Sequence, residues 1–302
     1  MTALRSAISW LYAKPYLLLV LTALFWAGNA IAAQFARGEI TAMQHVLLRW
    51  IMVFALVWPF YGRAALAALP QVRGHVVRVV YMAVAGFTGF NILFYVASFN
   101  TTAVNVGILQ GSVPVMVFVG SFLFLRLSVG WLQWVGVVVT LLGVAMVATQ
   151  GAPWLMMEIG FNYGDVMMLL SCVCYASYAL LLPGRPAMSG AVFFTLMSPI
   201  ALITAIPFAA YEAATVEAYV WPSLQGVLVT LFVAVFPATL AQQFFMRGVE
   251  LIGPGRAGVF TNMVPIFAAG LAVLILGEIF AWYHAAALVM VLGGIALTQR
   301  GT

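Results

Sequence analysis

Polar and aromatic side chains recur at helical spacing in four stretches of this otherwise apolar chain. In the first stretch, Trp26, Asn29 and Ala33 are spaced i, i+3 and i+7, so they share one helix face. The other three stretches hold Asn91, Tyr95 and Ser98; Ser171, Tyr175 and Tyr178; and Thr239, Gln242 and Gln243. Amide edges and aromatic faces in one wall suit a ligand that is partly apolar and partly hydrogen-bonding.

The amide side chains have an alternative role, since a polar side chain inside a membrane also joins helices through hydrogen bonds. Such a contact contributes about 0.6 kcal/mol on average. For Asn29, Asn91 or Gln242 taken singly, the sequence does not separate the two roles. Four stripes in related segments favour the lining of a cavity.

Two segments combine a helix-breaking proline with amide side chains. In "NVGILQGSVP" (105–114), Pro114 lacks a backbone donor and clashes with the carbonyl of Gln110. Asn262 stands just before Pro265 in the second segment. A freed carbonyl in a bilayer is tolerated only beside protein or a watery cavity. We therefore expect both segments to face the interior, with Asn105, Gln110 and Asn262 toward a cavity.

The glycines of the first segment suit close helix packing better than ligand binding. Gly107 and Gly111 form a small-residue pair four positions apart, as at many membrane helix contacts.

The sequence offers no catalytic or metal-binding pattern. The three histidines are scattered without ligand spacing, and Lys14 is the single lysine, so a P-loop is excluded. Cys172 and Cys174 point about 200° apart on a helix and are expected to be buried as small apolar residues. We expect neither an enzyme nor a cofactor.

Composition defines the elements that must position these residues. Of the 302 residues, 65% are apolar and 6% are charged, which is far below the charge of a soluble domain. The sequence therefore predicts an all-α integral membrane protein. Because a span needs roughly 20 apolar residues, ten spans are predicted at 16–36, 43–61, 78–98, 103–124, 131–149, 164–182, 191–211, 224–245, 257–276 and 282–299.

The charges of the chain are divided between the two sides of this ten-span topology. Ten basic residues fall on one side: Arg5, Lys14, Arg63, Arg73, Arg78, Arg126, Arg185, Arg247, Arg256 and Arg300. Arg37 and Arg49 fall on the other side, with every acid except Glu250. Positive loops stay in the cytoplasm, so both termini are predicted to be cytoplasmic, and the net charge of +5 reflects topology rather than nucleic-acid binding.

The chain repeats itself at an offset of 151 residues. This shift places Gly107 on Gly258, Gln110 on Thr261 and Pro114 on Pro265, and it continues with Trp131 on Trp282. A nearby shift of 149 places "FWAGNA" (25–30) on "CYASYA" (174–179). We interpret residues 1–150 and 164–302 as two five-helix repeats of one membrane domain. Five is odd, so the second repeat is inverted, and transporters of this kind hold substrate near the midplane at the repeat interface.

Charged residues within the spans are few. Arg49 lies near the outer end of its span, and the favoured interpretation is that its side chain extends to the outer interface. Asp165 and Glu278 lie at span ends, where a structural role is one interpretation of Glu278. Without an acid at the midplane, facilitated or weakly coupled transport is favoured over proton-driven transport.

The chain resembles the EamA type of the drug/metabolite transporter superfamily over nearly its whole length. The matching stretches are "LFWAGNAIAAQF" (24–35), "LLRW" (47–50), "TTAVNVGILQGSVPV" (101–115), "RAGVFTNMVPIFAAGLAVLILGEIF" (256–280) and "GGIAL" (293–297). The first repeat departs from the pattern, with Arg126 and Leu127 where the second has Gly277 and Glu278. Glu278 therefore has no acidic counterpart in the first repeat.

More narrowly, the chain resembles the YddG-type exporters of aromatic and other amino acids. This resemblance implies efflux across a bacterial inner membrane through a central cavity. We expect a zwitterionic amino acid to be held by Asn29, Gln110, Gln242 and Asn262, with its side chain against Trp26, Tyr95, Tyr175 and Tyr178. The bilayer and the substrate are the expected partners, with no nucleic acid, and the protein is expected to be a monomer or a weak homo-oligomer.

Two alternatives stay open. A carrier of another metabolite or a nucleotide sugar would need cations in the cavity, and only Arg49 could supply one. A channel-like pore would need a continuous polar lining and would conduct without saturating.

Overall fold

The structure is a computed structural model that describes residues 10–126, 130–152, 162–216 and 219–299. Within these ranges the chain is helical and contains no strand. The first half holds α2 (Pro15–Ala36), α3 (Ala42–Val72), α4 (Val76–Ala83), α5 (Phe90–Asn100), α6 (Ala103–Gln110), α7 (Val113–Leu125) and α8 (Trp131–Ala148). The second half holds α9 (Tyr163–Leu181), α10 (Gly190–Thr215), α11 (Leu224–Val233), α12 (Ala241–Ile252), α13 (Pro254–Val259), α14 (Met263–Leu271) and α15 (Trp282–Gln299).

Eight helical stretches in the described residues are long and apolar enough to cross a membrane, so the protein is a multi-pass membrane protein. One of them, Ala42–Asn100, is 59 residues long and covers the two spans predicted at 43–61 and 78–98. A shorter apolar helix, Trp282–Thr298, covers the last predicted span. The count of ten and the inverted repeat stay predictions.

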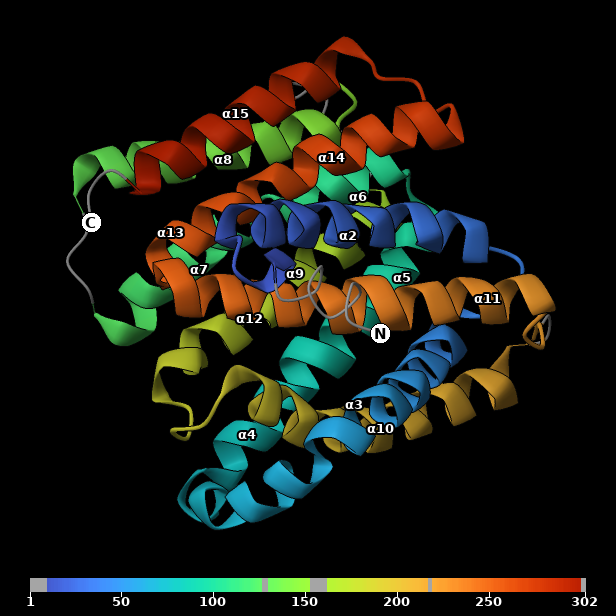
Figure 1. Cartoon of the computed structure of the whole chain (residues 1–302). Coiled ribbons are helices and arrows are strands. Elements are labelled where there is room, and N and C mark those ends of the chain that lie inside the picture. Colours follow the sequence, from blue (N-terminus) through green and yellow to red (C-terminus); the bar gives the residue numbers. More distant parts are fainter. Residues whose placement is uncertain (1–9, 127–129, 153–161, 217–218, 300–302) are drawn as a thin grey trace.

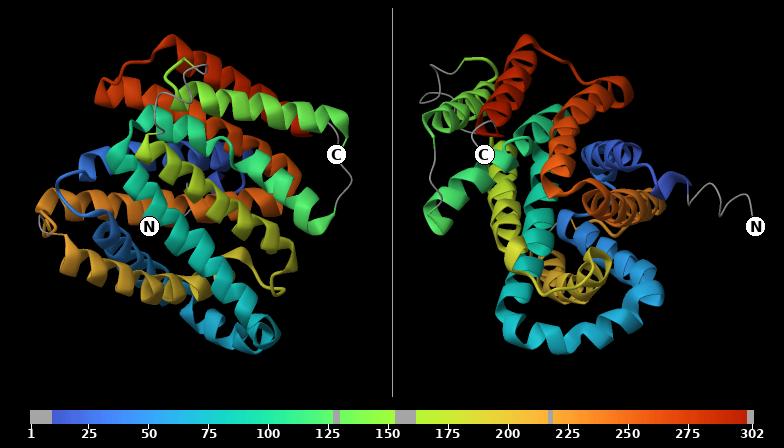
Figure 2. Two further views of the ribbon diagram at one scale, coloured as in Figure 1. Left: turned by 180° about the vertical axis from the view of Figure 1, so that it is seen from behind. Right: turned by 60° about the vertical axis from the view of Figure 1, so that its left-hand side comes forward.

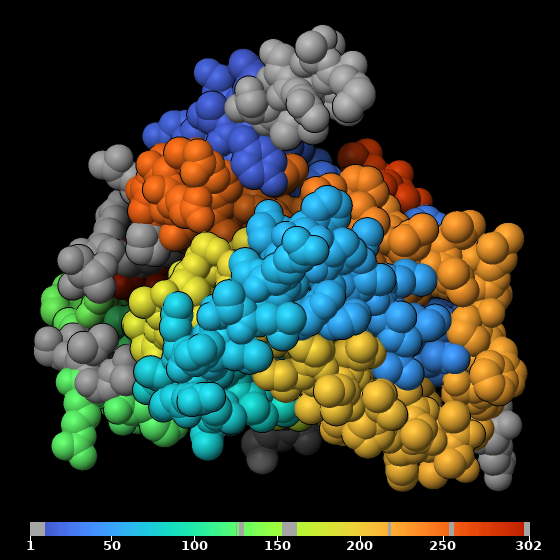
Figure 3. Space-filling view, turned by 60° about the horizontal axis from the view of Figure 1, so that its bottom comes forward, coloured from blue at the N-terminus to red at the C-terminus, as the bar shows by residue number. Residues whose placement is uncertain are grey.

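The helix α3 runs further than the predicted span at 43–61. It continues through Pro59 and the exposed Arg63 to Val72. The added segment, "GRAALAALPQV", is rich in alanine and leucine, which favour the helix even where it leaves the apolar span. Helix α3 lies against α10, and Figure 3 shows both on one face of the molecule, α3 in blue and α10 in gold.

The helices pack mainly against helices of the other half of the chain. Helix α8 lies along α15 and α3 along α10, as Figures 1 and 2 show, and α6 lies along α14. Two further contacting pairs are α5 with α9 and α2 with α12. The shift of about 151 residues carries α5 onto α12 and α2 onto α9, so the two pairs correspond to each other. The two halves therefore share one core.

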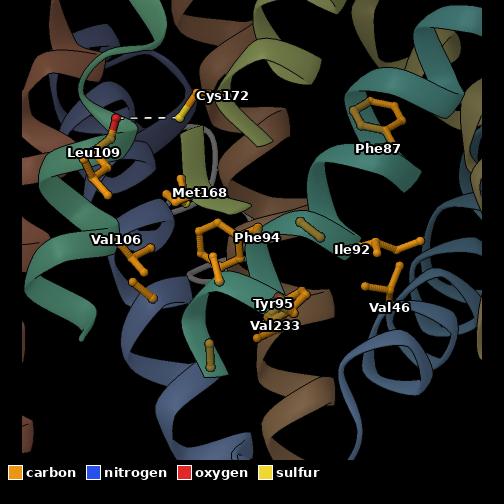
Figure 4. Close-up of a cluster of buried hydrophobic side chains, with 14 of the residues drawn as sticks. Val46, Phe87, Ile92, Phe94, Tyr95, Val106, Leu109, Met168, Cys172 and Val233 are labelled. Carbon is orange, nitrogen blue, oxygen red and sulfur yellow. Dashed lines mark hydrogen bonds between the residues drawn. The ribbon is translucent and has the colours of Figure 1, made fainter. Parts of the chain in front are cut away.

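The central core joins helices from both halves. Figure 4 shows Phe94 and Tyr95 of α5 beside Met168 of α9, with Val233 of α11 nearby. All four side chains are buried. Cys172 is also buried and free, and its Sγ donates a hydrogen bond to the Leu109 carbonyl at 3.6 Å.

Acidic side chains at one end of the bundle satisfy helix N-termini. Glu278 accepts hydrogen bonds from the backbone N–H groups of Ala103 and Val104, at 2.8 and 2.9 Å, where α6 begins. Glu212 accepts in the same way from the N–H groups of Met43 and Gln44, where α3 begins. These contacts satisfy donors that a helix start leaves free, and a negative charge is favourable there.

The opposite end holds arginines. Arg78 donates to the carbonyl of Gly184, and Arg247 donates to the carbonyl of Tyr12 at 3.3 Å. Helix α2 begins and α15 ends at this end of the bundle, at the left in Figure 1. Glu212 and Glu278 thus lie at the end of the bundle opposite to Arg78 and Arg247, in line with the division of charge in the sequence.

Three π-helical segments occur in the described helices, and two of them lie at matching positions of the two halves, whereas the third, η7 (Ala272–Leu276), follows α14. In the first half the matching segment is η2 (Val84–Gly89), between α4 and α5. In the second half it is η5 (Ala234–Leu240), between α11 and α12 and including Pro237. The 151-residue shift superposes the two segments. Such segments open the regular backbone bonding and are frequent at functional sites.

Gly107, the first glycine of the GxxxG pair, lies where α6 and α14 are in close contact. A Cβ added to Gly107 would collide with the Cβ of Ala268. The position that matches Gly107 in the second half is Gly258, which has no described atom within 4 Å of such a Cβ. The two matching glycines therefore have different structural roles.

We predict that Gly107→Ala destabilises the protein by about 1–3 kcal/mol, because overpacking forces α6 and α14 apart. Gly258→Ala is the matched control and should leave stability unchanged or raise it by up to about 1 kcal/mol, since alanine favours a helix. Thermal unfolding of the purified proteins in detergent measures both. Equal effects of the two substitutions would show that the α6–α14 contact is not close.

Candidate functional site

A cavity of about 150 Å³ lies between the two halves of the chain. Six of the eight predicted site residues line it: Trp26, Asn29, Gln110, Tyr175, Gln242 and Asn262. The predicted helix-breaking residues Pro114 and Pro265 line it as well. The predicted polar and aromatic stripes thus converge, while their binding of substrate stays a prediction.

Many lining residues come in pairs that are 151 positions apart. Asn91 pairs with Gln242, and Pro114 pairs with Pro265. The π-helical segments contribute two further pairs: Gly86 with Pro237, and Phe87 with Ala238. The same shift that reveals the repeat in the sequence therefore relates the two walls of the cavity.

Both proline segments interrupt their helices at the cavity. Helix α6 ends at Gln110, and α7 begins at Val113 with Pro114 in its first turn. The second segment changes from α13 through the 3₁₀ turn η6 (Phe260–Asn262) to α14. The breaks that the prolines predict are therefore present in both halves.

A carbonyl beside the first break finds new donors. The Leu109 carbonyl accepts from the hydroxyl of Ser112 at 2.7 Å, as well as from Cys172. These contacts replace part of the regular helical bonding that the break removes.

Tyr95 and Tyr178 do not reach the cavity. Tyr95 is fully buried behind the wall, and its hydroxyl donates to Asn29 Oδ1 at 2.7 Å. Tyr178 packs on the backbone of η2, where a Cβ on Gly86 would lie 2.5 Å from its ring. Both residues lie on the helix faces that their spacing predicts, but neighbouring elements cover them.

Asn105 also lies away from the cavity, in a polar cluster at the acidic end of the bundle. Its amide donates to the Asp165 carboxylate at 3.4 Å, and its Oδ1 lies 3.2 Å from His284 Nε2. Thr101 donates to the same carboxylate at 2.7 Å. The expectation that Asn105 faces the cavity is therefore corrected, because Asp165 and His284 provide partners for its amide.

Arg49 is the main lining residue whose position differs from the sequence expectation. Its side chain is 7% exposed and borders the cavity, so it does not extend to the outer interface. Nη1 donates to Asn91 Oδ1 and to the Tyr95 hydroxyl, the latter at 3.3 Å. Asn91 is oriented in turn by its amide, which donates to the Phe87 carbonyl in η2.

Trp50 and three phenylalanines also line the cavity and were not predicted as site residues. They are Phe87, Phe90 and Phe194. A buried aromatic residue in an apolar span has no signal in the sequence that separates it from the ordinary core. The sequence did contain a signal for Arg49, because a cation inside a membrane span is usually functional.

The described residues contain no group of three or more His, Cys, Asp and Glu side chains placed to hold a metal ion. The cavity itself is lined by aromatic rings, amides, the indoles of Trp26 and Trp50, and one guanidinium. Such groups can bind and orient a small polar solute.

Comparison with known proteins gives a consistent assignment. The sequence model of the EamA-like transporter family matches residues 13–149 and, separately, residues 162–300. Two Bacillus subtilis (strain 168) proteins described as uncharacterized transporters are similar. YetK is 27% identical over 224 residues, which cover 73% of this chain and 68% of YetK. YyaM is 25% identical over 203 residues, which cover 65% of this chain and 64% of YyaM.

One crystal structure of another protein has a similar fold. The two superpose with a TM-score of 0.62 at 17% identity, over 94% of this chain and 96% of the other. This similarity concerns the fold alone.

The hydrogen bonds that join Arg49, the Tyr95 hydroxyl and Asn29, here called the Tyr95 bridge, predict a measurable effect on stability. Tyr95→Phe leaves Asn29 Oδ1 without its donor and Arg49 with one acceptor fewer, which should destabilise the protein by about 1–3 kcal/mol. Tyr211→Phe is the control, because Tyr211 is 64% exposed. Thermal unfolding followed by tryptophan fluorescence measures both variants. A Tyr95→Phe variant as stable as the control would contradict the bridge.

Proposed function

The chain belongs to the EamA-like transporter family, and from this we propose that it is a secondary transporter that exports aromatic and other neutral amino acids. It is a membrane transporter, and membership of this family implies a small-molecule substrate. One observation supports the substrate class: the central cavity combines amide groups with aromatic rings where helices of both halves are interrupted. Amides meet an ammonium as acceptors and a carboxylate as donors.

In this proposal the polar part of the substrate lies among four amides and its side chain lies against two rings. The amides are Asn29, Gln110, Gln242 and Asn262, and the rings are Trp26 and Tyr175. Tyr95 and Tyr178 support this site from behind, Tyr95 by its hydrogen bond to Asn29 and Tyr178 by its ring contact with Tyr175.

The mechanism proposed is alternating access between two inverted five-helix repeats. It is supported by the two separate matches to one family model and by the paired lining residues. In such a transporter one repeat rocks against the other about the central site. We further propose that the protein lies in the bacterial inner membrane with both termini in the cytoplasm, on the side of the positive loops.

The cavity argues against the two alternatives. A nucleotide sugar carries two phosphate charges, whereas the described lining of this cavity contains a single cation, Arg49. A pore requires a continuous polar lining, but apolar residues such as Phe87, Phe90 and Val264 interrupt this one. Saturable counterflow of radiolabelled phenylalanine in proteoliposomes, with competition by other amino acids and a nucleotide sugar, separates the three functions.

We predict that Trp26→Ala and Gln242→Ala each lower counterflow of phenylalanine by about tenfold, because a lost ring or hydrogen bond removes about 1–2 kcal/mol of binding. Membrane insertion should be unaffected, since each change removes one wall group. Trp221→Ala is the control, as Trp221 is 77% exposed. If counterflow were unchanged by alanine at all six predicted lining residues, the substrate site would have to lie elsewhere.

We also predict that an imposed pH gradient does not drive uphill accumulation of the amino acid. The reason is that the described cavity lining contains no Asp or Glu to carry a proton with the substrate. Uptake into proteoliposomes with and without a pH gradient tests this. Accumulation that collapses with a protonophore would establish proton coupling instead.

A further inference from the structure

Arg49 carries a buried positive charge with no acidic partner among the described residues. The single ion pair within those residues joins Arg247 to Glu250. Asp165 and Glu278 are bound to other groups at the end of the bundle. A guanidinium remains charged in proteins, and burying an unpaired charge costs several kcal/mol. A ligand anion would offset this cost.

One edge of the guanidinium has no acceptor among the described residues. Nη1 has two hydrogens, and both have acceptors, namely Asn91 Oδ1 and the Tyr95 hydroxyl. Nε is buried without a hydrogen-bond partner, and Nη2 donates to no described residue. The Nε–Nη2 edge presents two parallel donors, which match the two oxygens of a carboxylate.

Two further donors border the cavity beside Arg49. The indole Nε1 of Trp50 is buried and has no partner. Asn29 has its oxygen fixed by the Tyr95 hydroxyl, so its amide N–H groups are the part that is left for a ligand. An unpartnered acceptor, Asn262 Oδ1, borders the same cavity from η6. The α2–α3 wall is therefore donor-rich.

From these contacts we infer that Arg49 binds the carboxylate of the transported solute, so that the cavity selects solutes with one carboxylate. The inference rests on the proposed function in taking this cavity as the transport site. An amino acid would then direct its carboxylate toward α3, leaving its ammonium for acceptors such as Asn262 Oδ1.

Charge favours a carboxylate over a phosphate ester. The described lining contains Arg49 but no Lys, His, Asp or Glu, so its formal charge is that of one arginine. A carboxylate neutralises this charge. A phosphate ester carries about −1.5 to −2 at neutral pH and would leave negative charge buried.

The test compares matched acids and amides on the purified protein in detergent. The probes are 3-phenylpropionate, 3-phenylpropionamide, phenylalanine, succinate and phenyl phosphate, and binding is measured by tryptophan quenching, since Trp26 and Trp50 line the cavity. Wild-type protein should bind 3-phenylpropionate at least about tenfold more tightly than its amide, as expected for a buried charged hydrogen-bond pair. This comparison needs no variant.

The variants locate the preference at Arg49. Arg49→Gln should weaken binding of 3-phenylpropionate by at least about tenfold and leave the amide within about twofold, while Arg49→Lys should retain part of the preference for the acid. Arg63→Gln is the control, because Arg63 is exposed and far along α3. Thermal unfolding without ligand confirms that each variant is folded.

The outcomes separate this inference from the proposed function. If 3-phenylpropionate binds through Arg49 but phenylalanine does not, the inference holds and amino-acid export fails. If phenylalanine binds equally well to wild type and Arg49→Gln, amino-acid transport stands and the inference is overturned. It is also overturned if the amide binds as tightly as the acid, if phenyl phosphate or succinate binds more tightly than 3-phenylpropionate, or if no carboxylate binds.

Discussion

Inside a lipid bilayer every backbone N–H and C=O group must find a partner within the protein, and this requirement governs the architecture. Regular helices meet it alone, so each interruption needs local compensation. In this chain four interruptions gather in one place: the break between α6 and α7, the turn η6, and the π-helical segments η2 and η5. All four border the same cavity. The cavity and these four irregular segments thus coincide, because backbone polar groups released by a break are tolerated beside protein or a watery cavity.

The compensation extends from backbone to side chains. Segment η2 leaves the Phe87 carbonyl to be bonded by the amide of Asn91, which turns the oxygen of that amide toward Arg49. Arg49 in turn meets the Tyr95 hydroxyl, which donates to Asn29. One irregular turn in the backbone therefore fixes the orientation of groups on three different helices. Such a chain of bonds holds the donor-rich wall rigid before a solute arrives.

The sequence predicts much of this because helical spacing decides which residues share a face. Trp26 and Asn29 reach the cavity together for that reason, and Pro114 and Pro265 break their helices through their own chemistry. Spacing does not say which neighbour covers a face. Tyr178 lies on the predicted face, yet Gly86 lets η2 approach and cover it. Arg49 stays buried because acceptors 42 and 46 residues away surround it, and no local pattern reveals them.

The pairing of helices across the halves has a consequence for biosynthesis. During translation α3, α6 and α8 enter the bilayer well before α10, α14 and α15, against which they pack. Lipid is no poorer a solvent than protein for their apolar faces, so the early helices can wait there as separate spans. Arg49 and the break between α6 and α7 are unfavourable in contact with lipid during that interval, because a charge and unbonded backbone groups cost free energy there. These polar groups then need water, lipid headgroups or an insertion factor as hydrogen-bond partners until the later helices pack around them.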